Sequence, residues 1–334
     1  MANSSTDIVT GSGLSTPVIA LRTSCIAVIS LLIVTGNILS IAVTRSLPSL
    51  ADSTKVLMTT LAVYDLFAGA AGLVAIIPSA LDRWPFGDPG CLIMATWASM
   101  CAMMSITSIV FLNIERYIAI TRPYEFPIWC SKRRVVGLVV CTSMIHFGIA
   151  VLNTVGMPLL YIPAAAVCTY TLDNDFFYIV ALITMDICPT ISLTFIYYRL
   201  IKISRQHELR NPRNKDNAAH RAQDNKALRS FLAVTLTYSI CYTPMLVRNI
   251  AVGFSCTELP RWMVFVFVWL YISNSALNVV IFCLFNKAFR QRAKKILAGR
   301  FTCFNNSVGF LGNTAEADRS QAVSEQRVRT VAKS

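Results

Sequence analysis

Long apolar runs separated by short polar segments make up most of this chain. Seven runs are each about as long as the roughly 20 residues that a helix needs to cross the hydrocarbon core of a membrane. Lipid offers no hydrogen bonds to free backbone groups, so each run is predicted to be helical. The predicted spans are residues 22–45, 55–80, 91–121, 135–161, 176–200, 229–254 and 262–284. The pattern predicts an all-α membrane protein, a seven-transmembrane helix bundle.

Polar segments surround this bundle, which is predicted to occupy residues 22–284. Residues 1–21 form a short polar tail without the basic and apolar pattern of a cleaved signal peptide. Residues 201–228 are basic and rich in Asn, Gln and Arg, and are expected to form a loop that extends the cytoplasmic ends of the fifth and sixth helices. Residues 285–300 are predicted to form a short amphipathic eighth helix, and residues 301–334 a disordered tail.

The composition supports a membrane protein and argues against a nucleic-acid partner. Of 334 residues, 55% are hydrophobic and only 14% are charged, whereas a soluble domain carries about 25% charged residues. The net charge of +13 would suit a nucleic-acid ligand. The basic residues, however, lie in short clusters that membrane-length apolar runs separate, so no continuous basic face is expected.

The basic clusters predict how the bundle is oriented. Residues 45–55, 116–134, 199–229 and 287–334 hold 26 of the 30 lysines and arginines. Lysine and arginine favour the cytoplasmic side, so this is predicted to be the inner side of the plasma membrane. The N-terminus is then extracellular and the C-terminus cytoplasmic. The opposite side keeps only Arg22, Arg83, Arg248 and Arg261.

Apolar residues recur at helical spacing among basic residues after the seventh span. Phe285, Phe289, Ala293 and Ile296 would face anionic inner lipid from an interfacial helix. Cys303 follows this helix and is either a palmitoylation site or an ordinary reduced cysteine. At the other end of the chain, the sequon Asn3-Ser4-Ser5 makes Asn3 the predicted glycosylation site.

Several polar residues lie in or at the ends of the third and second spans. Twenty-five residues separate Cys91 from Arg116, which is a helical rise of about 37 Å. The two residues are therefore expected at opposite membrane surfaces. Asp65 lies within the second span, where a carboxylate is costly and by default functional. Cys168 follows the fourth span on the outer side.

These residues and their neighbours resemble the rhodopsin-like (class A) G-protein-coupled receptors over about residues 22–297, loosely nearest their amine, melatonin and opsin branch. The motifs are Trp84-Pro85-Phe86-Gly87 with Cys91, Glu115-Arg116-Tyr117, and Cys241-Tyr242-Thr243-Pro244. The resemblance implies a Cys91–Cys168 disulfide, with free thiols as the alternative. It also implies an inactive-state latch for G-protein coupling between Arg116 and Asp224, with separately solvated charges as the alternative.

The resemblance also implies a polar core and a helix switch. In the family, the core holds an allosteric sodium ion at the residue matching Asp65; a water-filled network is the alternative. No other cofactor is expected. The core residues are Asn37, Asp65, Ser105, Asn274 and Asn278. Pro244 would kink the sixth helix, and Tyr197 matches a tyrosine that stabilises the active state.

The switch departs from the family pattern at three places. Tyr242 stands where tryptophan is usual, and the fourth helix has no tryptophan. The seventh helix has Phe282 in place of the usual tyrosine, and Val279 in place of proline. Because Phe282 has no hydroxyl to bridge through water to Tyr197, the expected consequence is either weak coupling or a strongly restrained resting state.

The expected ligand site lies among the outer halves of the helices. Ala98 stands where aminergic receptors carry an aspartate, so an amine salt bridge is not expected. Asp186 and Arg248 would face the site or pair with each other; alternatively Asp186 bonds a neighbouring helix and Arg248 extends to the interface. The predicted ligand residues are Met94, Trp97, Ala98, Ala102, Asp186, Arg248, Asn249 and Trp269, with Tyr242 nearby. Their mostly apolar character favours a small lipid-like or indole-like ligand.

The predicted function is a receptor, not an enzyme, that binds an extracellular small molecule and activates a heterotrimeric G protein. Membrane lipid surrounds it, and arrestin and a receptor kinase are further expected partners. One alternative is a weakly coupling or chemosensory receptor with altered switch motifs. Another is a membrane transporter, although seven spans do not divide into two related halves. The sequence contains no His/Asp cluster or metal-binding histidine pair that would indicate a membrane enzyme.

Overall fold

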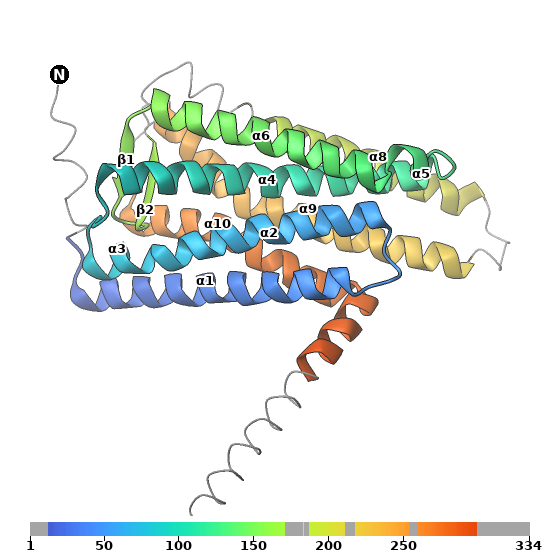
Figure 1. The fold of residues 1–334 in the computed structure, drawn as a ribbon, viewed down its shortest axis with the longest axis horizontal. Coiled ribbons are helices and arrows are strands. Elements are labelled where there is room, and N and C mark those ends of the chain that lie inside the picture. The colour runs from blue at the N-terminus through green and yellow to red at the C-terminus, as the bar shows by residue number, and fades with distance from the viewer. Residues whose placement is uncertain (1–12, 171–182, 184–186, 211–217, 254–258, 299–334) are drawn as a thin grey trace, which may run out of the picture.

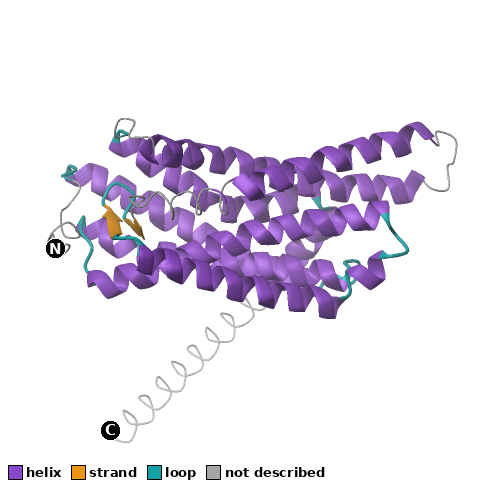
Figure 2. Ribbon diagram, turned by 90° about the horizontal axis from the view of Figure 1, so that it is seen from above, coloured by secondary structure: helices purple, strands orange, loops and turns teal. Residues whose placement is uncertain are grey.

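The computed structural model describes residues 13–170, 183, 187–210, 218–253 and 259–298, and within it long helices lie side by side in a bundle (Figure 1). A short hairpin lies at one end, here called the hairpin end, and the other end is called the Arg116 end (Figures 1 and 2). The elements are α1 (Thr16–Arg45), α2 (Asp52–Val74), α3 (Ile76–Leu81), α4 (Gly87–Thr121), α5 (Phe126–Trp129), α6 (Lys132–Gly156), β1 (Leu159–Ile162), β2 (Val167–Tyr170), α8 (Cys188–Arg210), α9 (Ala218–Gly253) and α10 (Arg261–Phe285).

Among the described residues, five helical stretches are long and apolar enough to cross a membrane. They are Thr16–Arg45, Asp52–Leu81, Gly87–Thr121, Lys132–Gly156 and Arg261–Phe285. They overlap the predicted first four spans and the seventh. The predicted fifth span begins in residues that lie outside the described part, and α8 covers its second half. The helix α9 covers the sixth span almost to its end.

Two of the boundaries that differ from the predictions have a local explanation in the sequence. The first helix begins at Thr16, six residues before the predicted bundle, with Pro17 in its first turn, where a missing backbone N–H costs nothing. The fourth helix ends at Gly156 instead of residue 161. Pro158 follows, and residues 159–162 form β1. Apolar residues in a buried strand and in a helix are not distinguished by hydrophobicity alone, which explains the overextended prediction.

The predicted segment 201–228 is largely helical where it is described. The helix α8 runs on to Arg210 and α9 begins at Ala218, so both extend beyond the apolar runs. After α10, Asn286 interrupts the helix and residues 287–298 form another, which leaves the bundle at an angle (Figure 1). Phe289 and Ala293 on this helix are buried, with Phe289 packed on Phe282 of α10 at 5.9 Å between ring centroids.

The core of the bundle is a continuous apolar cluster in the half nearer the Arg116 end. Leu57, Leu61, Ile109 and Leu112 are almost fully buried where α2 meets α4. Close approach of α1 and α2 depends on a glycine, because a Cβ at Gly72 would lie only 2.4 Å from the Ser30 hydroxyl oxygen. Small residues allow this kind of close helix contact in membranes.

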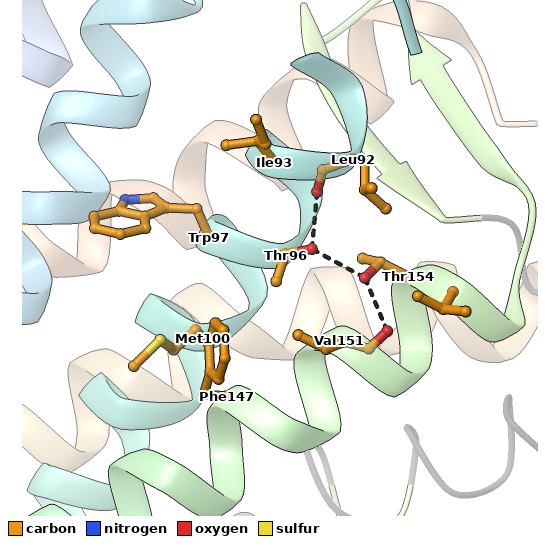
Figure 3. Close-up of a pocket in the computed structure, with 9 residues that line it drawn as sticks. Leu92, Ile93, Thr96, Trp97, Met100, Phe147, Val151 and Thr154 are labelled. Carbon is orange, nitrogen blue, oxygen red and sulfur yellow. Dashed lines mark hydrogen bonds between the residues drawn. The ribbon is translucent and has the colours of Figure 1, made fainter. Parts of the chain in front are cut away.

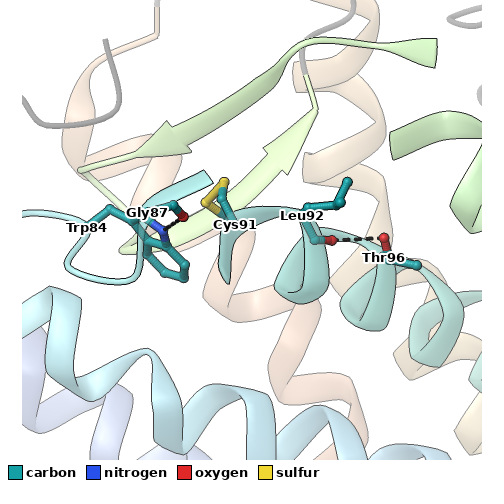
Figure 4. Close-up of a disulfide and its surroundings, with 6 residues drawn as sticks. Trp84, Gly87, Cys91, Leu92 and Thr96 are labelled. Atoms are coloured by element: carbon teal, nitrogen blue, oxygen red, sulfur yellow. Dashed lines mark hydrogen bonds between the residues drawn. A yellow bond between two sulfur atoms is a disulfide. The ribbon is translucent and has the colours of Figure 1, made fainter. Parts of the chain in front are cut away.

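The hairpin end is closed by β1 and β2, which pair antiparallel from Leu159 with Tyr170 to Ile162 with Val167. Cys91 at the start of α4 forms a disulfide with Cys168 of β2, with 5.3 Å between their Cα atoms (Figure 4). This confirms the expected pair. Trp84 packs on Tyr161 beside the disulfide, and its indole donates to the Gly87 carbonyl at 2.8 Å.

Candidate functional site

A cavity of about 380 Å³ lies under the hairpin, between α2, α4, α9 and α10. Successive turns of α4 place Met94, Ala98 and Ala102 on the wall of the cavity, because residues four apart share one helix face. The structure places six predicted ligand residues on this wall: Met94, Ala98, Ala102, Arg248, Asn249 and Trp269. Tyr242 also lines the cavity. Asp186 lies outside the described residues.

The prediction that Trp97 lines this cavity is wrong. Its side chain is 40% exposed on the outer surface of the bundle and lines a separate apolar groove between α4 and α6 (Figure 3). It packs on Phe67 at 5.2 Å between ring centroids. The reason is helical geometry, since one residue turns the side chain by about 100° relative to Ala98. A hydrogen bond of 2.9 Å between Thr96 and Thr154 joins the two helices at this groove.

Three tyrosines form a connected aromatic group at the deep side of the cavity. Tyr238 stacks on Tyr242, one helical turn away in α9, with 5.1 Å between ring centroids and 23° between planes. Tyr271 of α10 meets Tyr242 edge-on at 5.2 Å. All three line the cavity. The four-residue spacing of Tyr238 and Tyr242 was the sequence signal for this group, and Tyr271 could not be paired with them without the fold.

Asp65 of α2 is fully buried below this cavity and accepts hydrogen bonds from two other helices. Ser105 of α4 and Ser275 of α10 each donate to its Oδ1 at 2.8 Å. Asn278 donates to its Oδ2 at 2.9 Å. Ser105 and Ser275 also line the cavity, so the same two hydroxyl groups border both sites.

Two other predicted core residues have different partners. Asn37 donates to the backbone carbonyls of Ile33 and Ser275, and thus holds α1 to α10 beside Asp65. Asn274 lines the cavity, and its buried Oδ1 has no hydrogen-bond partner among the described residues. Ser275 takes the place expected for Asn274 at Asp65. Its spacing of three residues from Asn278, on the same helix face, was the available signal.

At the Arg116 end, Glu115 of α4 is buried against the start of α2. Its Oε1 accepts hydrogen bonds from the hydroxyl groups of Ser53 and Thr54. The Arg116 guanidinium donates to Thr54 at 3.0 Å, so Thr54 bridges the acidic and the basic residue. Tyr117 beside them is half-buried. Ser53 and Thr54 lie in the first turn of α2. Their hydroxyl groups gave no signal in the sequence that they would bind Glu115 and Arg116.

Some other predicted site residues lie outside the described part of the structure. For Pro244 and Phe282, the structure gives their position and burial. The side chains of Tyr197 and Asp224, in α8 and α9, lie outside it, and so do Asn3 and Cys303. The predicted Arg116–Asp224 latch therefore has no described geometry. Pro244 lies inside α9. Phe282 is 3% exposed and belongs to the apolar core.

An arginine at the hairpin end makes a set of contacts that sequence reasoning missed. Arg22 of α1 is 4% exposed and pairs with Asp82 at 3.0 Å. It also donates to the Ser79 hydroxyl at 3.1 Å, the Ser79 carbonyl at 2.6 Å and the Pro163 carbonyl at 2.7 Å. These contacts join α1, the end of α3 and the hairpin turn. The signal available was a charged residue inside an apolar run.

The hairpin turn itself is inserted into the bundle. Ala165 and Ala166 are fully buried, and the Trp269 indole donates to the Ala165 carbonyl at 2.9 Å. On the outer side of this turn, burial raises the pKa of Tyr161 to about 12, with nearby Arg22 and Asp82 acting in opposite directions. The hairpin thus covers the cavity, and it is held there by the hydrogen bond of its Ala165 carbonyl as well as by the disulfide.

Comparison with known proteins places this architecture in a family. A family model described as 7 transmembrane receptor (rhodopsin family) matches residues 36–282. Dopamine receptor 1 of Drosophila melanogaster is 24% identical over 82% of this chain and 62% of its own length. Melatonin receptor type 1A of Mus musculus is 26% identical over 80% of the chain and 77% of its own length.

A third relative, the human histamine H2 receptor, is 23% identical over 90% of the chain and 86% of its own length. The chain therefore spans less than two thirds of the dopamine receptor, and more of the other two. The family match covers most of the chain and includes the cavity, the Asp65 core and the Glu115–Arg116 pair. This chain belongs to the rhodopsin family of seven-transmembrane receptors.

Proposed function

We propose that this protein is a receptor that binds a small molecule in the cavity under the hairpin and activates a heterotrimeric G protein at its Arg116 end. The cavity volume of about 380 Å³ is within the range of small-molecule sites. The names of its relatives support a small ligand, since dopamine, melatonin and histamine are all small molecules.

One observation carries this proposal: the cavity and the Asp65 core share two hydroxyl groups. Ser105 and Ser275 line the cavity while donating to Asp65. A ligand that moves α4 relative to α10 must therefore change the contacts of the buried carboxylate. Buried polar networks have few alternative arrangements, so such a change favours a different helix packing over a gradual adjustment.

The proposed orientation puts the hairpin outside the cell. The basic clusters at residues 116–134 and 287–298 lie at the Arg116 end, and basic residues favour the cytoplasmic side. The N-terminus is then extracellular and the C-terminus cytoplasmic, in the plasma membrane. The helix of residues 287–298 would rest on inner lipid, and the chain beyond it would meet a receptor kinase and arrestin.

We further propose that the Asp65 core holds a sodium ion. A hard cation needs oxygen ligands, and Asp65, Ser105 and Ser275 supply a carboxylate and two hydroxyl oxygens. The Oδ1 atoms of Asn274 and Asn278 are also buried without a partner among the described residues. When bound, the ion would neutralise Asp65 and favour the resting packing.

A second candidate function is a weakly coupling receptor. Phe282 packs on Phe289 in the apolar core, where the family usually has a tyrosine. A phenyl ring can stabilise this packing but cannot form a hydrogen bond with α8 in an active state. This receptor would bind its ligand normally and exchange nucleotide slowly on its G protein.

The experiment is G-protein nucleotide exchange catalysed by the full-length protein in lipid nanodiscs. Arg116→Ala is expected to lower basal exchange at least several-fold, whereas Arg122→Ala, which removes an exposed arginine at the same end, should leave it near wild type. Equal rates for all three proteins, together with solute uptake into proteoliposomes, would favour a transporter. Phe282→Tyr tests the second candidate, which predicts faster exchange in this variant.

A calcium readout through chimeric G proteins would then screen for the ligand. Sodium is tested separately by thermal unfolding in sodium or potassium chloride. Wild type is expected to be more stable in sodium, and Asp65→Asn to lose that difference. An equal sodium effect in both proteins would exclude the Asp65 site.

A further inference from the structure

The charge of the residues that line the cavity indicates which kind of ligand it can bind. Most of its wall is apolar or aromatic, and its polar groups are hydroxyls, amides and one cation. Arg248 of α9 is the single charged residue among the described residues that line it. Asp65 lies beyond the wall, with both carboxylate oxygens already accepting hydrogen bonds. The cavity is therefore electropositive as far as its described wall determines it.

The Arg248 guanidinium is half-buried and poorly satisfied by the described part of the protein. Its hydrogen bond to the neighbouring Asn249 side chain is long, with 3.4 Å between Nη1 and the Asn249 Oδ1. No described carboxylate lies within 4 Å of it, in contrast to Arg22 at the same end, which has an acidic partner and three further acceptors. A guanidinium has five N–H donors, and leaving them without acceptors in an apolar wall is costly.

The α4 wall of the cavity has no acidic group for a cationic ligand among its described residues. Ala98 and Ala102 present methyl groups to the cavity from α4, and Met94 continues the same face. A ligand ammonium group placed here would lose its hydration and gain no carboxylate from the described lining residues, while lying in the same cavity as a fixed positive charge. Both effects disfavour an amine and favour an anion.

We infer that the ligand is a small organic anion, with a carboxylate or equivalent charged group at Arg248 and an apolar or aromatic body against Ala98, Ala102 and the tyrosine group. This inference rests on the proposed ligand-binding function and specifies its ligand class. An arginine fork binds a carboxylate through two parallel hydrogen bonds, which gives orientation as well as attraction.

The spacing of the wall residues limits the length of this ligand. Arg248 and Tyr242 lie six residues apart on α9, which corresponds to about 9 Å along the helix axis. Indole-3-acetate and medium-chain fatty acids such as octanoate have a charged group and an apolar body of about that length. The edge of Tyr242 and the face of Trp269 would contact the body, while the hairpin strands cover it from above.

The test compares anionic, neutral and cationic forms of one ligand skeleton. The probes are indole-3-acetate, indole-3-acetamide and tryptamine, with octanoate, octanamide and octylamine as a second series. Binding is measured by the thermal unfolding shift of the full-length protein in nanodiscs over a range of probe concentrations. For wild type, the carboxylate of at least one series is expected to stabilise the protein at a concentration about tenfold or more below its amide and amine.

Variants of Arg248 assign the preference to that residue. Arg248→Gln, which keeps a hydrogen-bonding group on a shorter side chain but removes the charge, is expected to abolish the carboxylate preference. Arg248→Lys keeps the positive charge but not the planar guanidinium, and it should retain part of the carboxylate preference. Arg261→Gln removes an exposed arginine at the same end and should behave as wild type. The melting temperatures without probe show whether each variant is folded.

Three results would overturn the inference: a wild type that prefers amines, one with no charge preference in either series, or a carboxylate preference that survives Arg248→Gln. The proposed receptor function fails separately. Carboxylate binding without nucleotide exchange on any G protein would remove the signalling role and leave the ligand class intact. Amine binding with normal exchange would do the reverse.

Discussion

The buried ion pair between Arg22 and Asp82 gives a sharp prediction for stability. Asp82→Asn keeps the shape and one acceptor oxygen of the side chain but removes its charge. Asp82 has left-handed backbone angles, φ 52° and ψ 26°, which asparagine adopts readily, so the substitution adds little backbone strain. The perturbation is therefore almost purely electrostatic.

The magnitude follows from what surrounds the arginine. Removing one partner of a fully buried ion pair costs about 3–5 kcal/mol, because the other charge stays buried and uncompensated. Arg22 is 4% exposed but Asp82 is 17% exposed, and the Ser79 and Pro163 carbonyls and the Ser79 hydroxyl remain as acceptors. We therefore expect a loss of about 2–3 kcal/mol, which corresponds to a Tm lower by about 5 °C for a chain of this size.

The assay is thermal unfolding of the purified full-length protein in nanodiscs, with Asp52→Asn as the control. Asp52 pairs with Lys55 at 3.5 Å, but its side chain is 68% exposed, so the control should change stability by less than about 0.5 kcal/mol. If Asp82→Asn melts within a degree of the control, the Arg22 charge is compensated elsewhere and the reasoning is refuted. A double-mutant cycle with Arg22→Met should give a coupling energy of about 2 kcal/mol.

Three further predictions concern the hairpin and the bundle surface. Cys168→Ser opens a loop of 77 residues and should cost about 4 kcal/mol in unfolding experiments, whereas loss below 1 kcal/mol would show that the hairpin is held without the disulfide. Because burial raises the pKa of Tyr161 to about 12 from 10, its neutral form stabilises the fold below pH 10, and this contribution is lost as the pH rises to 12. Tyr161→Phe should therefore lose less stability than wild type over that pH interval, and parallel curves would contradict this. Trp97→Ala should leave carboxylate binding unchanged, since the indole lies on the outer surface, whereas Trp269→Ala should weaken it; equal losses would place Trp97 in the cavity.

The disagreement at Trp97 and the agreement at Ala98 have the same origin. Sequence places both residues at the outer half of the third span, and either would suit a ligand site. Which of two consecutive residues faces inward depends on the rotation of α4 about its axis, and that rotation is set by its contacts with α2 and α6. A highly apolar helix carries little periodicity to fix it, since both lipid and protein neighbours accept apolar side chains.

At the Asp65 core, too, the sequence identifies the site but not all of its hydrogen-bond partners. A carboxylate in an apolar run identifies the site, because its burial is tolerated only with partners. The partners themselves come from two other helices, 40 to 213 residues away from Asp65 in sequence. Sequence supplied Ser105 and Asn278 through the family resemblance, but whether Asn274 or Ser275 bonds Asp65 is decided by the rotation of α10.

The sequence by itself determined the membrane class, the positions of the helices over most of their length and the distance of Arg116 from Cys91 along its helix. These properties follow from requirements that are local or one-dimensional: apolar length, helical rise and the pairing of backbone groups in lipid. Tertiary structure alone decided the contacts of Arg22 with Ser79, Asp82 and Pro163, the insertion of Ala165 under Trp269, and the position of Arg248 in a mostly apolar cavity wall. Each depends on which side chains meet across helices, and the free energy of such contacts exists only once the helices have packed.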